Sequence, residues 1–578
     1  MLKRTNKITS LLVIVAAMVS VLPSGAKAAA SDELQSKKGE IYNAIAYKDG
    51  EFYISGQPYK KDEAAYYLSN GKYSELDDID YDDKAEIYGS KYVKADDGDY
   101  YVDLSSGKVS EDDLEGDTLD NASVALRSKI KSDNDGRIDD ADAKEIKDIM
   151  ALKGAKFSDD AWYEAQYTAK DSSTNGGVGI INVYTDANGK YVDADYNIGK
   201  IKVKLSDGKT STIQNTNNED SNVTAQVSDA KVIGQDSNNI YRLAKITVKA
   251  AKSGVTVKEV NGITVSSSAT AISASDDGTA VSFETIQIIS KTQASGKVDG
   301  IKYAKDVYSY MLSDADGKST ELLGGDESNF TVAGGKLVNY EVTSDSVEAQ
   351  LVNLKTKSST YYIELGDYDH VKLSNGESDV DIDSQGNLWA VSDEAVYEFD
   401  NDEDFQKVYT VDDDEEYTDL SVYDKDNLIA WNANDEIYSI ISKGSETSDD
   451  NEGAGAGTGT NTGSTAGNTT PPVSTVQAGW VLTNGSWSYN NADGTKFKGW
   501  LQASGGVWYY LDTTNGVMAT GWKYINGQWY YLDPSSGAMR TGWLNDNGTW
   551  YYLKASGEML SNTTVDGYKL GADGAWIK

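Results

Sequence analysis

The sequence predicts an all-β protein with a small helical segment: an acidic β domain, a flexible linker and a C-terminal β-hairpin solenoid. Three observations predict this class. Tryptophans near the C-terminus recur every 21 residues, at positions 487, 508, 529 and 550, and so short a period indicates a repeat array. Many short apolar-alternating runs further upstream end at Gly-containing turns. Two segments within that upstream region also repeat each other at an offset of 40 residues.

Residues 1–28 have the pattern of a secretory signal peptide. Three basic residues precede an apolar run over residues 11–22, and Ala26-Lys27-Ala28 forms a small-x-small cleavage site. The apolar run is shorter than a membrane-spanning helix requires. We therefore expect a secreted protein that has no membrane span after the signal is removed.

Charge is concentrated between the signal and the repeats. Residues 29–475 hold 85 acidic and 42 basic groups, a net charge of −43, whereas residues 476–578 carry equal numbers of both. This excludes nucleic acid as a partner, because phosphate has the same sign. The acidic surface has two interpretations, solubility through self-repulsion or attraction of divalent cations. The chain has no cysteine, so no disulfide stabilises it.

The acidic β-rich domain is predicted over residues 29–443. Within it, the stretch beginning at Asp379 matches the stretch beginning at Asp419. About 40 residues with several strands is the size of one propeller blade, so residues 378–441 predict propeller-like blades. A pair of β-sandwiches is the alternative, and the Thr- and Val-rich stretch 205–290 suits a sandwich-like insertion or a separate domain.

A helical pair is predicted near residues 120–151, where Leu, Ile and Met recur at helical spacing. The connection between its helices resembles part of a calcium-binding loop. Its first ligand position is occupied by Lys131 instead of a carboxylate or amide. Calcium is therefore one possible cofactor, and an acidic turn without metal is the alternative. The four candidate calcium ligands are Asp133, Asp135, Asp139 and Asp142.

Residues 444–475 consist mainly of Gly, Thr, Ser, Asn and Ala and close at Pro471-Pro472. Such a composition cannot bury a core, so it predicts a flexible linker.

The C-terminal repeats, residues 476–578, hold nine of the twelve tryptophans. Each unit opens with Gly-Trp, continues with Trp-Tyr-Tyr-Leu and closes with Gly-x-Met. Asn526-Gly527 and Asn547-Gly548 precede two of the Trp-Tyr-Tyr strands and predict hairpin turns. Stacked hairpins would leave aromatic boxes between them. Such boxes suit a quaternary ammonium, which ring faces attract, or a sugar, which stacks on them, while other rings serve packing.

The repeated motif of Gly-Trp, Trp-Tyr-Tyr-Leu and Gly-x-Met resembles the choline-binding, or cell-wall-binding, repeat family of Gram-positive surface proteins. The resemblance implies that each box takes two tryptophans of one hairpin and a tyrosine of the next, with a methionine nearby. Ser488 replaces the first tyrosine of the first unit, and Tyr568 and Trp576 mark the last unit as a cap. The implied ligand-binding residues are Trp480, Trp487 and Tyr510; Trp500, Trp508 and Tyr531; Trp522, Trp529 and Tyr552; Trp543 and Trp550; and Met518, Met539 and Met559.

The composition argues against most hydrolase mechanisms. One histidine, His370, cannot supply a zinc site, and a cysteine nucleophile is absent. We expect a non-enzymatic, secreted, cell-wall-associated protein that the repeats anchor non-covalently to teichoic-acid choline or wall polysaccharide, displaying the acidic domain. The alternative is a wall-targeted carbohydrate-active hydrolase, because a glycosidase needs only two carboxylates.

Overall fold

The computed structural model describes residues 32–442 and 479–577 apart from short gaps, so the predicted signal peptide and linker lie outside the described residues. The chain divides into two compact units, which we call the N-terminal unit (32–442) and the C-terminal unit (479–577). Within the described residues, no helix combines the length and apolar character needed to cross a membrane. The gaps are 82–83, 155, 160, 172, 218–221, 359, 484–485, 492–494, 503–507, 513–514, 526–527, 534–536, 547–548, 555–556, 566–567 and 572.

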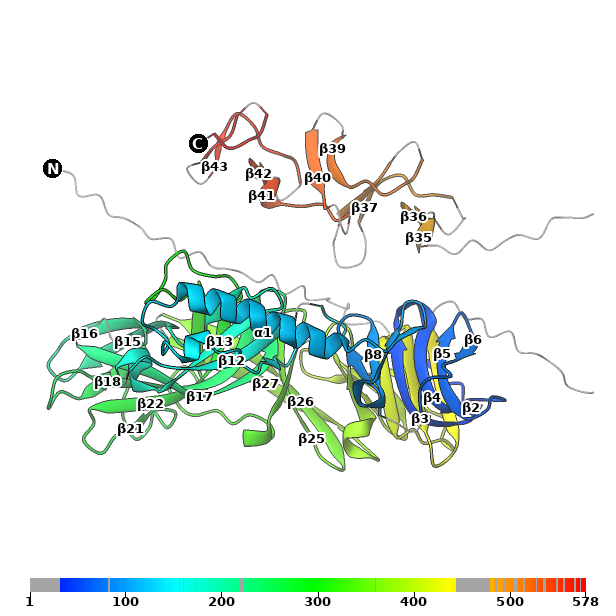
Figure 1. The fold of residues 1–578 in the computed structure, drawn as a ribbon, viewed down its shortest axis with the longest axis horizontal. Helices are drawn as coiled ribbons and strands as arrows, with labels where there is room; N and C mark the ends of the chain where they lie inside the picture. The colour runs from blue at the N-terminus through cyan, green and yellow to red at the C-terminus, as the bar shows by residue number, and fades with distance from the viewer. Residues whose placement is uncertain are drawn as a thin grey trace, which may run out of the picture. The chain divides into compact units, whose positions relative to one another are not determined.

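The N-terminal unit begins with antiparallel sheets whose strands pair in chain order (Figure 1). Residues with positive φ form tight turns between consecutive strands, as Asp49 and Gly50 do between the first two strands of the first sheet. The first sheet contains β3 (Glu40–Tyr47), β4 (Glu51–Gln57), β5 (Ala64–Ser69) and β6 (Lys72–Glu75). The second contains β7 (Glu86–Tyr88), β8 (Tyr92–Ala95), β9 (Tyr100–Asp103) and β10 (Lys108–Ser110). The third contains β11 (Met150–Ala151), β12 (Trp162–Thr168), β13 (Ile180–Asp186) and β14 (Tyr191–Asp193).

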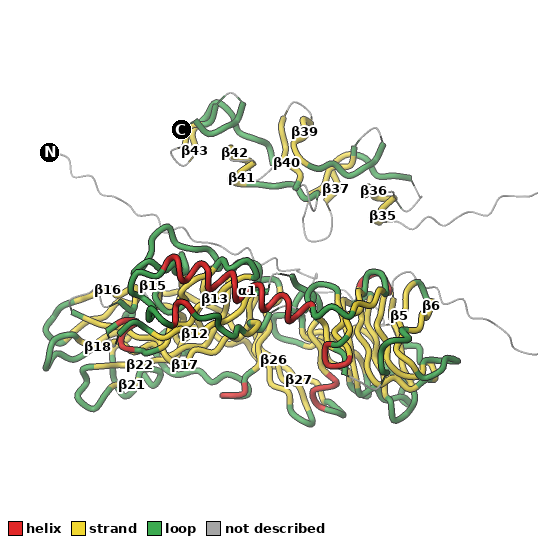
Figure 2. The backbone as a smooth tube through the Cα atoms, in the orientation of Figure 1, coloured by secondary structure: helices red, strands yellow, loops and turns green. Residues whose placement is uncertain are grey.

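One long helix, α1 (Leu114–Asp133), confirms the first member of the predicted helical pair (Figure 2). The side chain of Asp113 accepts a hydrogen bond from the backbone N–H of Gly116 at 2.8 Å and caps the helix. Ala122, Leu126 and Ile130 recur every four residues and are fully buried. They join the apolar cluster that includes residues of β12 and β13, so α1 covers the third sheet.

The second predicted helix is wrong. Residues Asp142–Lys144 form a single 3-10 turn, and β11 begins at Met150. The carboxylate of Asp139 accepts hydrogen bonds from the backbone N–H groups of Ala141 and Asp142. Such local side-chain bonds offer the backbone an alternative to the helix, and they turn the chain back toward β12.

Residues 197–372 contribute two sheets, and strands of both, between Ile198 and Met311, share one apolar cluster in a sandwich-like packing. The smaller sheet pairs in the order β16 (Thr210–Asn215), β15 (Asn197–Leu205), β19 (Val257–Val260), β20 (Ile263–Thr264). The larger pairs in the order β17 (Val223–Gln235), β18 (Asn239–Ala250), β22 (Ala280–Ser290), β23 (Val307–Met311), β27 (Thr360–Lys372), β26 (Ser346–Lys357), β25 (Lys336–Val342), β24 (Asn329–Ala333), with β21 (Ser273–Ala274) beside β22.

The 40-residue repeat corresponds to two successive antiparallel sheets, and strands from the start of the unit complete both. Strand β1 (Asp32–Glu33) pairs with β31, and β2 (Lys37–Lys38) pairs with β34. The last sheet also packs against the first, because Ile429 and Trp431 share a cluster with Phe52. The repeated strands are β28 (Val380–Ile382), β29 (Leu388–Val391), β30 (Ala395–Phe399) and β31 (Phe405–Thr410), then β32 (Asp419–Asp424), β33 (Asn427–Asn432) and β34 (Ile437–Ser442).

Three carboxyls in or just before the strands of these two sheets make a pH dependence of stability predictable. Burial first, and then the neighbouring Glu416, raise the pKa of Asp379 to about 6. Burial, and then Asp379, raise the pKa of Asp419 to about 6. Burial, and then Asp383, raise the pKa of Glu398 to about 7. A carboxyl whose pKa is higher in the folded state stabilises the fold at low pH and loses that contribution as pH rises through the folded-state pKa.

We therefore expect the urea midpoint of the N-terminal unit to fall between about pH 4, the pKa of an unfolded-state carboxyl, and about pH 7. Asp379→Asn should flatten this fall and stabilise the unit at pH 8 by on the order of 1–3 kcal/mol, because Asp379 is fully buried. The exposed Asp393 supplies the control variant Asp393→Asn, which should follow the wild type. A midpoint that rises over this interval would contradict the assignment.

The described C-terminal unit consists of two-stranded antiparallel hairpins, as predicted. The predicted turns at 526–527 and 547–548 lie outside the described residues. Successive hairpins are joined by backbone hydrogen bonds: the N–H of Met539 donates to the carbonyl of Trp508, one hairpin earlier, at 2.8 Å. The hairpins are β35 (Gly479–Thr483) with β36 (Ser486–Asn490), β37 (Gly499–Gln502) with β38 (Trp508–Leu511), β39 (Gly521–Ile525) with β40 (Gln528–Leu532), β41 (Gly542–Asp546) with β42 (Thr549–Leu553), and β43 (Thr564–Val565) with β44 (Tyr568–Lys569).

Candidate ligand site: aromatic pockets of the repeats

Hairpin pairing fixes which aromatic rings meet inside each repeat. Trp522 lies directly opposite Tyr531, and their ring centroids are 5.1 Å apart in an edge-to-face contact. Trp500 and Tyr510 form the same pair one hairpin earlier, at 5.2 Å. Edge-to-face pairs of this kind stabilise a fold beyond the area they bury. The Gly-Trp tryptophan of both hairpins is therefore held in one orientation by its own cross-strand tyrosine.

The first fully described pocket is built around Trp500. Its ring lies 6.3 Å from that of Trp508 at 84° and 4.9 Å from that of Tyr530, in the next hairpin, at 64°. Trp508 is 37% exposed, whereas Trp500 and Tyr530 are half-buried. We call this arrangement, three rings at steep angles with one of them open to solvent, an aromatic box.

The second pocket repeats this geometry around Trp522. Its ring lies 6.4 Å from that of Trp529 at 85° and 4.8 Å from that of Tyr551 at 67°. Trp529 is 42% exposed. The two sets of ring distances agree. The arrangement of the three rings therefore recurs from one repeat to the next, as the hairpin itself does.

The tyrosine whose ring contacts the preceding hairpin is the neighbour of the one that the resemblance implied. Tyr531 and Tyr552 were expected to close the boxes of the preceding hairpins, but they contact Trp522 and Trp543 of their own hairpins. The ring contacts to the preceding hairpins come from Tyr530 and Tyr551. Neighbouring residues of a strand point to opposite faces. One tyrosine of each Trp-Tyr-Tyr run therefore faces the tryptophan of its own hairpin, and the other faces the preceding hairpin.

We expect the two tyrosines to respond differently to substitution. Tyr530→Leu removes one ring of the first pocket and should weaken binding there of choline, the ligand that the resemblance implies, by about 30-fold, the loss that corresponds to one ring contact of roughly 2 kcal/mol. Tyr531→Leu keeps an apolar side chain against Trp522 and should change the same site far less. Equilibrium titration of each full-length variant with choline measures both effects. A larger loss for Tyr531→Leu would restore the original assignment.

A third pocket uses a residue that was expected to belong to a cap. The ring of Trp543 lies 5.4 Å from that of Tyr568 at 80°, so Tyr568 takes the place that Tyr530 and Tyr551 hold. Trp550, the remaining tryptophan of this hairpin, is 38% exposed. Sequence reasoning missed Tyr568 because the last unit no longer carries the Trp-Tyr-Tyr phrase.

The first predicted box is described only in part. The side chain of Trp480 lies outside the described residues. Trp487 is 43% exposed, and Tyr510 contacts Trp500.

The methionines pack between repeats. A Cβ at Gly537 would collide with the sulfur of Met518, and the same holds for Gly557 against Met539 and for Gly574 against Met559. These glycines also have positive φ, 75° at Gly537. The Gly-x-Met phrase therefore stacks each unit on the next, so the side chains of the predicted Met518, Met539 and Met559 have a packing role.

A carboxylate adjoins the second pocket. The indole N–H of Trp522 donates to the carboxylate of Asp546 at 3.0 Å. Burial first, and then Asp546, raise the pKa of Tyr531 in the same hairpin. Because the carboxylate and the ring faces both favour positive charge, this pocket is suited to a cation.

The four candidate calcium ligands do not converge. Asp133 is bonded to Lys297 at 2.8 Å and to the hydroxyl of Tyr191 at 2.7 Å. Asp142 is paired with Lys147, and Asp139 caps its own turn. Asp135 lies in the same connection, and among the described residues no three acidic, histidine or cysteine side chains gather around a metal position. Calcium binding here stays a prediction.

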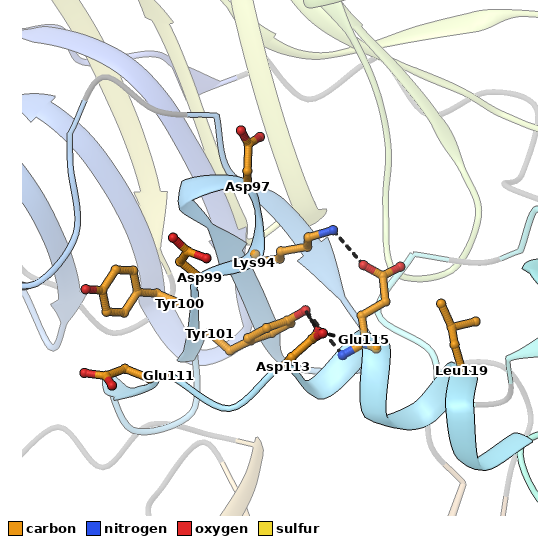
Figure 3. A pocket seen from close by; sticks show the side chains of 11 residues that line it. Lys94, Asp97, Asp99, Tyr100, Tyr101, Glu111, Asp113, Glu115 and Leu119 are labelled. Carbon is orange, nitrogen blue, oxygen red and sulfur yellow. Dashed lines mark hydrogen bonds and ion pairs between the residues drawn. The ribbon is translucent and has the colours of Figure 1, made fainter.

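A carboxylate-lined pocket of about 630 Å³ lies beside the start of α1 (Figure 3). Several of its groups are already engaged: Glu115 pairs with Lys94 at 2.7 Å, and Asp113 caps the helix. Asp97, Asp99 and Glu111 border the rest of this pocket. His370 lies elsewhere, exposed on β27 opposite Glu348.

Known proteins share the repeats. A family model described as Choline-binding repeat matches residues 478–520 and 519–563. The choline binding domain of Spr1274 in Streptococcus pneumoniae is 36% identical over 18% of this chain and 96% of that chain, with a TM-score of 0.11. Choline binding protein F from Streptococcus pneumoniae is 19% identical over 49% of this chain and 83% of that chain, with a TM-score of 0.17. A search of curated proteins found no match.

A cell-wall endolysin from phage Cp-1, solved complexed with choline, is 36% identical over 17% of this chain and 30% of that chain, with a TM-score of 0.14. The fold and the ring contacts define the C-terminal unit as an array of hairpins with clusters of aromatic rings between them. The repeats of this chain belong to the choline-binding repeat family.

Proposed function

We propose that the protein is a secreted, non-enzymatic surface protein that its repeats anchor non-covalently to choline groups of the cell wall. The observation that carries this proposal is the recurrence of one three-ring box around Trp500 and Trp522. A quaternary ammonium cannot donate hydrogen bonds, so ring faces and a nearby carboxylate are its natural partners. Each desolvated contact contributes roughly 2 kcal/mol.

Several weak boxes on one chain favour a polymer over a free ligand. Choline groups borne on one wall polymer, such as teichoic acid, would engage neighbouring pockets at high effective concentration. The acidic N-terminal unit would then be displayed from the wall on the predicted linker. Its small meander sheets, closed by β1 and β2, support a propeller-like display domain.

Binding to purified, choline-containing cell walls tests the proposal. We expect the full-length protein to sediment with the walls and to be released by free choline, with little release by dextran at equal concentration. Release by dextran and not by choline would favour wall polysaccharide as the ligand. Failure to sediment would contradict wall anchoring.

The alternative of a carbohydrate-active hydrolase has one supporting observation, the carboxylate-lined pocket beside α1 with Tyr100 and Tyr101 in its wall. A zymogram on purified walls separates the two functions. We expect no clearing band. A band that is lost in Glu111→Gln and kept in His370→Ala would favour the hydrolase.

A further inference from the structure

A second cavity in the N-terminal unit, of about 320 Å³, has the opposite electrostatic character from the pocket beside α1. Its lining comes from β7, the connection before β12, the end of β17, β24, β25 and β28. Two lysines, Lys153 and Lys156, belong to this lining, and none of the described lining residues is acidic. In a region whose net charge is −43, a pocket lined by basic and not acidic groups is suited to an anion.

The two lysines differ in how well they are neutralised. The ammonium of Lys156 is held by both carboxylate oxygens of Asp381, at 2.6 and 2.9 Å. The ammonium of Lys153 has only a 3.5 Å contact to the amide oxygen of Asn329 and lies 5.9 Å from the ring centroid of Tyr340. Lys153 is exposed to solvent, and partial burial of its ammonium, and then repulsion from Lys231, lower its pKa. A bound anion would offset both effects, so Lys153 is the group that gains most from a ligand.

Gln235 provides a second, independent indication of a ligand. This side chain is 7% exposed and lines the same cavity. Its Nε2 donates to the carbonyl of Leu152 at 3.0 Å, which fixes the orientation of the amide. Its Oε1 is buried and has no hydrogen-bond partner. Leaving a buried acceptor unpaired costs about 1–3 kcal/mol, and a ligand N–H or O–H would remove that cost.

The remaining walls are apolar. Ile233, Phe330, Val332 and Ile382 border the cavity, and Phe330 and Ile233 belong to one buried cluster. Few polar groups converging on an apolar surface are typical of small-molecule sites.

We propose that this cavity binds a small organic carboxylate that carries a neighbouring N–H or O–H group. The carboxylate pairs with Lys153, the donor bonds to Oε1 of Gln235, and the apolar body packs against Phe330 and Ile233. Two sources share this chemistry, an acylated amino acid such as a peptide C-terminus and a sugar acid.

Calorimetric titration of the full-length protein tests the proposal with two probes, N-acetyl-D-alanine and D-glucuronate. N-acetyl-D-alaninamide, which lacks the carboxylate, is the matched neutral probe. We expect one acid to bind saturably and the amide not to bind. Binding of the alanine derivative identifies the peptide source, and binding of the uronate identifies the sugar acid.

Two substitutions of residues that line the cavity test whether the acid binds there. Lys153→Met and Gln235→Leu should each weaken the acid at least tenfold, with circular dichroism confirming that the fold is kept. Lys355→Met, at an exposed lysine that pairs with Glu364 on the surface, should leave binding unchanged. Absence of binding by both acids, equal binding of the amide, or wild-type affinity in both cavity variants would overturn the proposal. Choline should not compete, so this result is separable from wall anchoring.

Discussion

Replacing Trp508, Trp529 and Trp550 together with alanine should abolish retention of the full-length protein on choline-agarose. Each of these tryptophans is exposed, between 37% and 42%, and each supplies the open wall of one pocket. Losing a ring contact of roughly 2 kcal/mol corresponds to about a 30-fold loss per pocket. Because the pockets act on one polymer or resin together, the losses compound.

The exposed positions make this triple variant a test of binding and not of folding. The hairpin core is formed elsewhere, by fully buried leucines such as Leu511, Leu532 and Leu553. Ile577→Ala, at a residue of the same unit that is 52% exposed, is the matched control and should be retained like the wild type. Undiminished retention of the triple variant would show that the open tryptophans do not bind choline.

Asp195→Ala should destabilise the N-terminal unit by about 3–5 kcal/mol, the cost of leaving a buried charge without its partner. Arg242 is fully buried and donates to Asp195 at 2.9 Å, to Gln287 at 2.8 Å and to the carbonyl of Ala194 at 2.9 Å. These bonds tie the segment after β14 to β18 and β22. Removing the carboxylate leaves the guanidinium charge uncompensated in the core.

Urea unfolding of the full-length protein measures this loss. Glu364→Ala breaks an exposed pair with Lys355 in the same unit and should cost less than about 1 kcal/mol. Equal midpoints for the two variants would show that the buried network does not stabilise the fold.

Local pattern was sufficient to predict the hairpins of the repeats. The 21-residue spacing of tryptophans matches the spacing of the described hairpins, and alternation along Trp-Tyr-Tyr predicts that neighbouring tyrosines face opposite ways. It does not say which tyrosine faces the preceding hairpin. That depends on how hairpins stack, which the backbone bond from Met539 to Trp508 determines. The sequence therefore did not single out Tyr530, whose ring contacts that of Trp500.

The acidic domain shows where local pattern fails. The 40-residue repeat predicted two matched sheets, but nothing in residues 32–38 marks them as the strands that complete those sheets. The predicted second helix had the right apolar spacing, yet Asp139 uses local hydrogen bonds to form a turn instead. The candidate calcium ligand Asp133 is similarly committed to Lys297, a residue far away in sequence.

Titration of tryptophan fluorescence with choline tests the central claim most directly, because nine of the twelve tryptophans lie in the repeats. We predict a saturable change in the full-length protein with choline, its loss in the triple tryptophan variant, and no saturable change with glucose oligomers. A saturable response to the oligomers, with none to choline, would contradict the assignment of these pockets to a quaternary ammonium.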